Sequence, residues 1–279
     1  MIDGLKMKPF SVLMSVYEKE KGEFLNRALL SIYDEQIIKP NQIVLVEDGP
    51  LNDELYAVIR LWQEKLPEIF TSVPLKKNVG LGDALASGMT HCQNDLIARM
   101  DSDDVAMPNR FQKQLEIFHQ MEIDVCGATI GEFEYDEQQI DGYRKTPQHH
   151  DDIVQFAKSR NPINHPVVMF KKSAVLKAGN YQKALWMEDY FLWVRMILDG
   201  ARFYNIPEML LKMRAGKGQL LRRSGLKYAL NEFKTGWKFH QMGFLSLGEF
   251  VRVFMPKFMA RILPKKMLAF VYTKMRSSF

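Results

Sequence analysis

Residues 96–104 read Leu-Ile-Ala-Arg-Met-Asp-Ser-Asp-Asp, an apolar run that ends in three carboxylates. The run Leu96–Met100 predicts a buried strand, so the aspartates emerge where that strand ends. Carboxylates packed this closely repel one another. A hard cation such as Mg²⁺ or Mn²⁺ would neutralise them and would complete its own ligand shell with substrate phosphates. Acidic triplets in loops are mostly solvated turns, however, so the rest of the chain must decide between a metal–diphosphate site and a turn.

Short apolar runs alternate with amphipathic segments over the first 130 residues. Strands are predicted at 10–17, 43–46, 69–75, 96–100 and 123–130, and helices at 23–37, 53–66, 80–91 and 108–121. This alternation predicts an α/β fold with a doubly wound, mostly parallel, Rossmann-like sheet. Ligands of such sheets bind beyond the carboxyl ends of the strands, where Tyr17, Glu47–Asp48 and Asp101–Asp104 all fall. Three polar stretches at one edge favour a ligand site over a simple turn.

Length and composition limit the class of protein. The chain has 279 residues, of which 47% are hydrophobic and 25% charged, enough for a large α/β domain with a sizeable core. Cys92 and Cys126 give neither a disulfide framework nor metal-ligand spacing, which favours a reducing compartment. We expect no signal peptide and no transmembrane helix, because no apolar run has the required length. Motifs of dinucleotide-binding, P-loop and serine-hydrolase proteins are not found.

The C-terminal region is strongly basic. Residues 218–279 carry twelve Lys or Arg and two Glu, a net charge of +10, although the whole chain carries only +5. From Phe250 to Met275 apolar residues interleave with cations, and Pro256 and Pro264 predict a break into short helices. Such helices can lie in a membrane interface and attract anionic lipid. They can also pack as an ordinary helix pair on the body of the protein, and the sequence leaves both possibilities open.

A second acidic pair stands at the start of a predicted helix. Glu188 and Asp189 precede an amphipathic segment that runs to Arg195. Carboxylates in a first helical turn are favoured by the helix dipole alone. The pair is therefore either a helix-start feature or part of a site.

The order of these stretches resembles glycosyltransferase family 2, the inverting nucleotide-sugar enzymes with the GT-A fold. The matching stretches are 11–17, 43–49, 78–85, 99–104 and 188–193, which together span roughly two thirds of the chain. Further on, 214–218 and 222–225 resemble a segment of bacterial O-antigen and capsular polysaccharide glycosyltransferases. The resemblance implies a GT-A catalytic domain over 1–215 and a basic amphipathic helical tail over 216–279. Within the domain, 1–130 would bind the nucleotide-sugar and 131–215 would form the acceptor side.

The resemblance also assigns roles to single residues. It implies that Asp48 accepts the ring N–H of uracil, and that Asp103, with Asp101 or Asp104, binds Mn²⁺ or Mg²⁺. Asp189 would be the catalytic base that deprotonates the acceptor hydroxyl, with Glu188 beside it holding sugar hydroxyls. The other residues expected to bind the nucleotide-sugar are Ser15, Val16, Tyr17, Glu47, Asn78, Gly80, Asp83, Arg99, Asp101 and Ser102.

The implied function is metal-dependent, inverting transfer of a hexose from UDP-Glc, UDP-Gal or an N-acetyl form. The implied acceptor is a polyprenyl-diphosphate-linked oligosaccharide of O-antigen or capsule biosynthesis. We expect a cytoplasmic bacterial enzyme, peripheral on the inner face of the plasma membrane, with its tail on the anionic surface and no nucleic-acid partner. One rival is a sugar-phosphate nucleotidyltransferase, which should carry a Gly-rich basic loop where this chain has Tyr17–Gly22. The other is a non-catalytic membrane or nucleic-acid adaptor, which would not need carboxylates at three strand ends.

Overall fold

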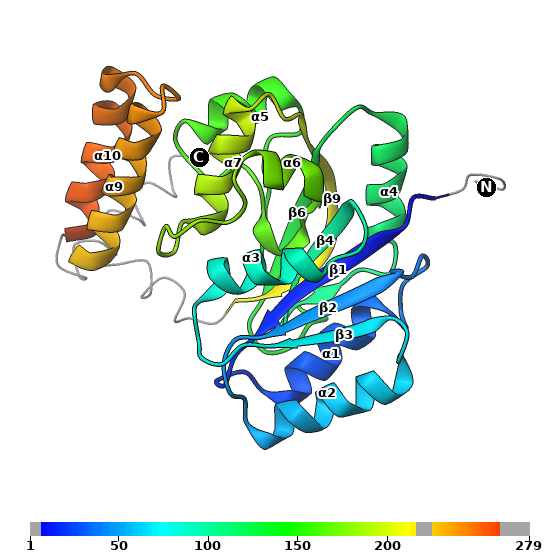
Figure 1. Ribbon diagram of the computed structural model, residues 1–279. Coiled ribbons are helices and arrows are strands. Elements are labelled where there is room, and N and C mark those ends of the chain that lie inside the picture. Colours follow the sequence, from blue (N-terminus) through cyan, green and yellow to red (C-terminus); the bar gives the residue numbers. More distant parts are fainter. Residues whose placement is uncertain (1–6, 216–224, 263–279) are drawn as a thin grey trace.

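The computed structural model describes residues 7–215 and 225–262. Within these ranges one nine-stranded sheet runs through the molecule in the order β3-β2-β1-β4-β8-β6-β9-β5, with β7 beside β6 (Figure 1). The strands are β1 (Phe10–Val16), β2 (Gln42–Glu47), β3 (Phe70–Pro74), β4 (Leu96–Asp101), β5 (Val105–Ala106), β6 (Val125–Phe133), β7 (Gly142–Arg144), β8 (Met169–Lys171) and β9 (Phe203–Arg214). The helices are α1 (Gly22–Ile32), α2 (Asp53–Lys65), α3 (Leu81–His91), α4 (Arg110–Gln120), α5 (His150–Ala157), the 3₁₀ turn η1 (His165–Val167), α6 (Lys172–Lys177), α7 (Glu188–Leu198), α9 (Leu226–Gln241) and α10 (Leu247–Ile262).

The N-terminal half of the sheet is parallel, as the strand–helix alternation predicts. Strands β2 and β4 flank β1, and β3 continues beyond β2. In this register Ser15 of β1 lies beside Val46 of β2 and beside Asp101 of β4. The carboxyl ends of the three strands therefore reach the same edge, and the prediction of one shared edge is confirmed.

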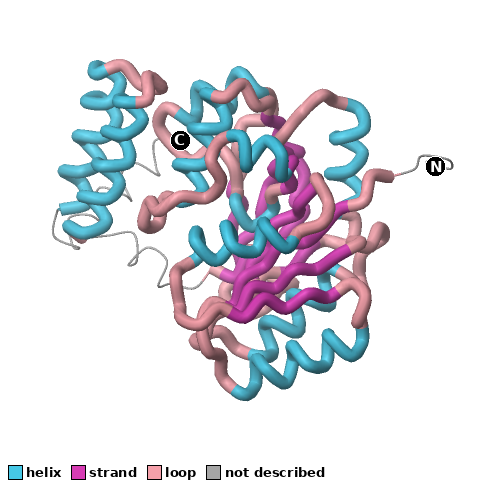
Figure 2. The backbone as a smooth tube through the Cα atoms, viewed as in Figure 1, coloured by secondary structure: helices cyan, strands magenta, loops and turns pink. Residues whose placement is uncertain are grey.

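Helices cover both faces of the parallel half (Figure 2). One core layer packs α1, α2 and α4 against the sheet, and the other packs α3, α6 and α7. Trp62 and Trp193, each at most 1% exposed, lie in the two layers. This arrangement is the doubly wound α/β architecture, and β1 and β2 are buried because both of their faces are covered.

The second half of the sheet is mixed in direction. Strand β8 is antiparallel to both β4 and β6, and the short β5 is antiparallel to β9. Strand β9 is long and runs parallel to β6, with register shifts near Thr129. Its last residue is Arg214, and its pairing with β5 places Lys212 opposite Val105, directly after the acidic stretch.

The helices α9 and α10 pack against each other and against α5 and α7. Their shared core includes Tyr190, Phe191, Phe239 and Phe254. The prediction that Pro256 breaks the tail into short helices is wrong, because α10 continues through this residue to Ile262. Packing on both sides of the proline outweighs the loss of one backbone hydrogen bond. Pro264 lies outside the described residues. Among the described helices none is long and apolar enough to cross a membrane.

The α9–α10 contact gives a stability prediction. A Cβ at Gly236 of α9 would lie 2.5 Å from the ring of Phe254 in α10. Gly236→Ala is therefore expected to destabilise the protein, because overpacking costs about 1–3 kcal/mol. The higher helix propensity of alanine offsets about 1 kcal/mol of this cost. Gly248→Ala is the matched control, because nothing lies within 4 Å of a Cβ there. Thermal unfolding should separate the two variants, and equal melting temperatures would contradict the packing argument.

Candidate active site

A hollow of about 500 Å³ lies at the ends of β1 and β2 and is lined in part by Tyr17, Asp48 and Asn78. The Asp48 side chain is buried, and each carboxylate oxygen accepts a backbone N–H, from Val79 at 2.7 Å and from Gly80 at 3.1 Å. The Asn78 amide donates to the Asp48 carbonyl at 3.2 Å. These bonds tie the loop before α3 to the end of β2. Three residues that the resemblance marks, far apart in sequence, thus come together.

The residues on either side of Asp48 shape this corner. Glu47 accepts a hydrogen bond from the Ser72 hydroxyl of β3, so its carboxylate is engaged within the sheet. Gly49 has φ of +90°, and a Cβ there would lie 2.6 Å from the backbone nitrogen of Asn78. Only glycine permits both this conformation and this close approach.

The end of β1 offers three different kinds of contact. Ser15 is half-buried, Val16 is fully buried, and Tyr17 is 43% exposed. Because the Val16 side chain belongs to the core, any contact of this residue with a bound base would come from its backbone. Its carbonyl already accepts the Asp48 N–H at 2.8 Å. Tyr17 is the residue of the three that presents a large side chain to the hollow.

The acidic stretch at the end of β4 is held by two arginines. Asp101 pairs with the guanidinium of Arg99, which is 2% exposed. Asp104 is 1% exposed, and one of its oxygens accepts the backbone N–H of Arg214 at 2.9 Å. Its other oxygen has no hydrogen-bond partner among the described atoms. Asp104 is therefore mainly a link between β4 and the end of β9.

Negative charge is in excess at this stretch. Burial raises the pKa of Asp103 to about 7, and the charges of Asp101 and Glu20 add to the rise. Burial, together with Asp101 and Asp103, also raises the pKa of Asp104. A bound cation would favour the ionised form of these neighbouring carboxyl groups and would offset their mutual repulsion.

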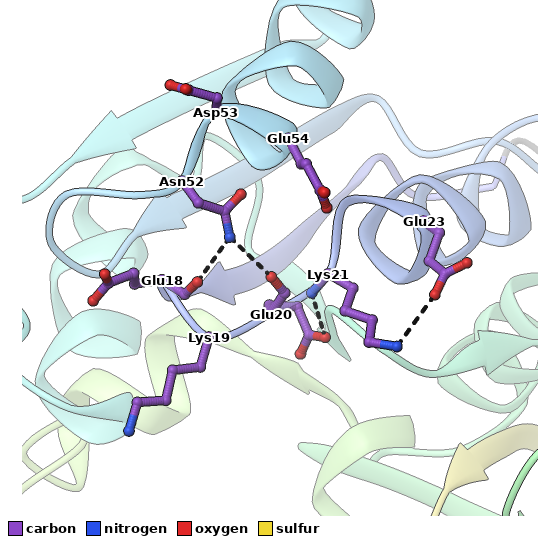
Figure 3. Close-up of a pocket in the computed structure, with 8 residues that line it drawn as sticks. All are labelled: Glu18, Lys19, Glu20, Lys21, Glu23, Asn52, Asp53 and Glu54. Carbon is purple, nitrogen blue, oxygen red and sulfur yellow. Dashed lines mark hydrogen bonds and ion pairs between the residues drawn. The ribbon is translucent and has the colours of Figure 1, made fainter.

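Glu20 joins the acidic stretch from the loop between β1 and α1. Its carboxylate accepts the Ser102 hydroxyl at 3.4 Å, and burial raises its pKa. The loop is fixed by Asn52, whose amide donates to the carbonyls of Glu18 and Glu20 at 2.8 and 3.2 Å beside a hollow of about 740 Å³ (Figure 3). Sequence reasoning missed Glu20, since one glutamate in a charged loop has no distinguishing pattern.

Arg214 is a second residue that sequence reasoning did not assign. Its Nε donates to the Asp103 carbonyl at 3.3 Å. Its guanidinium lies over the ring of Phe24 at 3.9 Å and over that of Phe133 at 4.7 Å, so two aromatic faces orient the cation beside the carboxylates. Segment 214–218 resembles a segment of O-antigen enzymes, but this resemblance assigned no role to Arg214.

Glu188 and Asp189 open α7, as predicted. Asp189 accepts the Asn161 amide at 2.6 Å on one oxygen and the Tyr190 N–H at 2.7 Å on the other. Glu188 accepts the backbone N–H of Trp186 at 3.2 Å. Burial raises the pKa of Glu188, and the nearby charge of Asp189 adds to the rise. Asp189 is thus held in a fixed orientation by donors on both oxygens.

Glu188 also contacts the start of α3. A Cβ at Gly82 of α3 would lie 2.8 Å from the Cγ of Glu188, so the start of α3 packs directly on that side chain. Burial raises the pKa of Tyr181, and the charges of Asp189 and Asp101 add to the rise. The Tyr181 hydroxyl is fixed by a 2.9 Å hydrogen bond with His165. Because the backbone of Val79 and Gly80, just before α3, binds Asp48, the start of α3 links Glu188 with the end of β2.

The metal prediction can be compared with the donor atoms present. In the described part of the chain, no three His, Cys, Asp or Glu side chains are grouped so as to hold a metal ion. A Mg²⁺ or Mn²⁺ site completed by substrate phosphates needs only one or two carboxylates. Asp103 and the 32% exposed side chain of Asp101 supply these. The donor set and its excess charge fit such an ion.

The chain is similar to known proteins in sequence and in fold. Residues 11–177 match the family model described as Glycosyl transferase family 2. The chain is 39% identical over 271 residues to the amylovoran biosynthesis glycosyltransferase AmsE of Erwinia amylovora, covering 96% of this chain and 99% of that protein. It is 34% identical over 271 residues to the UDP-Gal:alpha-D-GlcNAc-diphosphoundecaprenol beta-1,3-galactosyltransferase of Escherichia coli, covering 97% of each. The fold is similar to that of the mannosyltransferase PcManGT from Pyrobaculum calidifontis in complex with GDP-Man and Mn²⁺, with a TM-score of 0.66, 14% identity, and coverage of 90% of this chain and 69% of that chain.

Proposed function

The chain belongs to glycosyl transferase family 2 and is a glycosyltransferase, and from this premise we propose that it transfers a hexose, with inversion, from a UDP-sugar to a lipid-linked saccharide. The observation that carries the proposal is the link that the start of α3 makes between Asp48 at the end of β2 and Glu188 at the start of α7. The name of the Escherichia coli relative, with a UDP-Gal donor and a diphosphoundecaprenol acceptor, supports this choice of donor and acceptor. Family membership sets aside both the nucleotidyltransferase and the non-catalytic adaptor.

On the donor side, the hollow beside Tyr17 and Asp48 would receive the base. Each Asp48 oxygen accepts one backbone N–H, and a carboxylate oxygen has room for a second donor. A uracil N–H can therefore bind Asp48 without breaking the loop contacts. Asn78 lines the same hollow, Gly80 would support it through its N–H on Asp48, and Asp83 would face the sugar beside Glu188.

At the diphosphate, Asp103 together with Asp101 would hold Mn²⁺ or Mg²⁺. The bound ion would act as a Lewis acid that neutralises the departing nucleoside diphosphate. Arg99 pairs with Asp101, and Ser102 links the stretch to Glu20. Arg214 brings a fixed positive charge to the same place.

On the acceptor side, Asp189 would take the proton from the attacking hydroxyl. Inversion requires a single base on the face opposite the leaving group, and the two N–H donors on Asp189 fix the direction of its remaining lone pairs. Glu188, whose pKa is raised, would hold sugar hydroxyls beside it.

The proposed cellular location follows from the proposed acceptor. A polyprenyl-diphosphate-linked saccharide for O-antigen or capsule lies on the inner face of the bacterial plasma membrane, so we propose a cytoplasmic, peripheral enzyme. The basic region 216–279 would face the anionic lipid surface.

A donor panel tests the proposal. Purified protein is incubated with UDP-Glc, UDP-Gal, UDP-GlcNAc, UDP-GalNAc and GDP-Man, a synthetic GlcNAc-diphosphate lipid and either Mn²⁺ or EDTA. We expect transfer from one UDP-sugar, with inverted anomeric configuration and loss of activity in EDTA. Transfer from GDP-Man alone, retention of configuration or indifference to EDTA would each overturn the corresponding part of the proposal.

Asn161 gives a prediction about orientation of the base. Removing its hydrogen bond to Asp189 in Asn161→Ala should lower kcat about 10- to 100-fold, the value of a hydrogen bond to a charged group. The KM for the donor should stay near that of the unmodified enzyme, because the Asn161 side chain bonds Asp189 and the backbone N–H of Ile163 and does not line the hollow beside Asp48. Asn161→Asp should be worse still, since it places a second negative charge beside Asp189. Equal kcat for all three proteins would show that Asn161 does not position the base.

A further inference from the structure

The outer side of α10 carries a row of exposed apolar side chains. Leu247, Val251, Met255 and Met259 recur every four residues, and their exposed fractions lie between 41% and 54%. Residues at this spacing share one face of a helix, so the four form a continuous surface, here called the α10 stripe. Arg252 is the one charged residue among the exposed positions of α10 within 247–261.

The neighbouring helix α9 extends this surface and adds positive charge. Its exposed apolar residues are Leu226, Leu230 and Trp237, and its exposed charged residues are Lys227, Lys234 and Lys238. Trp237 contacts the ring of Phe250 in α10 at 5.4 Å, so the tryptophan stands at the seam between the two helices. In Figure 1 the pair stands side by side at one end of the molecule.

The acidic side chains of α9 and α10 form ion pairs. Glu232 is buried and paired with Arg261 at 2.8 Å. Glu249 is paired with Lys158, just beyond α5, at 2.7 Å. Over residues 226–261 no carboxylate is classed as exposed, whereas three lysines and one arginine are. The outer surface of the pair is therefore apolar and cationic at once.

We propose that this surface, the α10 stripe with Trp237 and its flanking cations, rests in the interface of an anionic bilayer. Large apolar residues rimmed by Lys and Arg are the composition that such an interface binds. Each cation near an anionic surface contributes about 1 kcal/mol. Lys234 and Arg252 are exposed on α9 and α10, whereas the ammonium groups of Lys227 and Lys238 lie at the rim, over the rings of Trp186 and Phe191. A second copy of the chain fits less well, because a twofold contact would bring the same cations face to face.

The surface is joined directly to the acceptor side of the site. The ring of Trp186 stacks on that of Tyr228 in α9 at 5.5 Å, and the Lys227 ammonium lies 5.8 Å from the centre of the Trp186 ring. Trp186 has φ of +65°, a costly conformation for a tryptophan, two residues before Glu188. Docking of α9 and α10 on a bilayer would therefore hold the Glu188–Asp189 loop near the lipid surface. The membrane contact extends the peripheral location given in the proposed function, and its consequence for the acceptor rests on the sugar transfer proposed there.

Vesicle flotation of the full chain tests the surface. The probes are phosphatidylcholine vesicles with and without phosphatidylglycerol, and the variant is Val251→Glu/Met255→Glu. Both positions are exposed, so the fold should survive, which circular dichroism checks. We expect the unmodified chain to float with the anionic vesicles, and the variant to bind at least about tenfold more weakly. The matched control is Leu61→Glu, a leucine 55% exposed on α2, which should float like the unmodified chain.

Several outcomes would overturn the inference. Equal flotation of the Val251→Glu/Met255→Glu variant and the unmodified chain would do so, as would equal binding to vesicles with and without phosphatidylglycerol. Loss of binding in Lys265→Gln/Lys266→Gln, with the stripe variant unaffected, would move the contact to the C-terminal residues. A dimer in light scattering that the stripe variant abolishes, with flotation unchanged, would assign the surface to a second copy. Normal flotation without transfer from any UDP-sugar would refute the proposed function and leave the membrane surface standing.

Discussion

Asp189→Asn is expected to slow sugar transfer by about 10²- to 10⁴-fold, the usual contribution of a general base. The change keeps the shape of the side chain but removes its ability to accept the acceptor's proton. Donor affinity should change little, because Asp189 contacts Asn161 and the Tyr190 N–H rather than the hollow beside Asp48. Steady-state kinetics with the preferred UDP-sugar measure turnover, and calorimetry with UDP measures donor binding.

Glu188 provides the internal control for this assignment. Its pKa is raised by burial and by the charge of Asp189, so Asp189→Asn should bring that pKa down towards the ordinary value. If Glu188 were the base, the Asp189→Asn enzyme would stay active and its pH–rate profile would move to lower pH. If Asp189 is the base, the variant stays slow at every pH, and Glu188→Gln mainly weakens substrate binding. Turnover of Asp189→Asn within about threefold of the unmodified enzyme would remove Asp189 from this role.

The parallel half of the fold was predictable because its signals are local. The apolar runs that became β1, β2 and β4 each end in a polar stretch, and the rule for parallel sheets places those ends together. The helix predicted from residue 53 also has a local start signal, because the side chain of Asn52 accepts the N–H of Leu55. Such features depend on residues within a few positions of one another.

The features that escaped prediction depend on contacts distant in sequence. Pro256 stays inside α10 because Phe254, two residues before it, is buried in the core shared with α7. Glu20 and Arg214 reach the acidic stretch from a loop and from a strand that only the folded sheet brings near. The long β9, paired to β6 with register shifts, likewise has no short-range signature. The resemblance to a family supplied the roles of Asp48 and Asp189, which spacing alone could not assign.

Asp103→Asn is expected to lower transfer by about 10²-fold or more, since a metal ion contributes several kcal/mol of charge stabilisation at the departing diphosphate. Activity measured against Mn²⁺ concentration should lose its metal dependence in this variant. Asp152→Asn, which neutralises an exposed carboxylate on α5, is the matched control and should behave like the unmodified enzyme. A fully active Asp103→Asn enzyme would contradict the assignment.

Thermal unfolding tests the same residue without catalysis. The pKa of Asp103 is raised from 3.8 to about 7, so the folded protein holds a proton that the unfolded chain releases between those values. The stability that this proton gives is fully present below about pH 4 and is lost as the pH rises through about 7. Mn²⁺ competes with the proton, so at saturating concentration it should raise the melting temperature on the order of 5 °C near pH 8 and by less near pH 6. In Asp103→Asn the extra stability at low pH should be smaller, and so should the rise in melting temperature with Mn²⁺. The reason is that the carboxyl group that binds either the proton or the ion is no longer present. Equal metal-induced shifts in the two proteins would place the cation elsewhere.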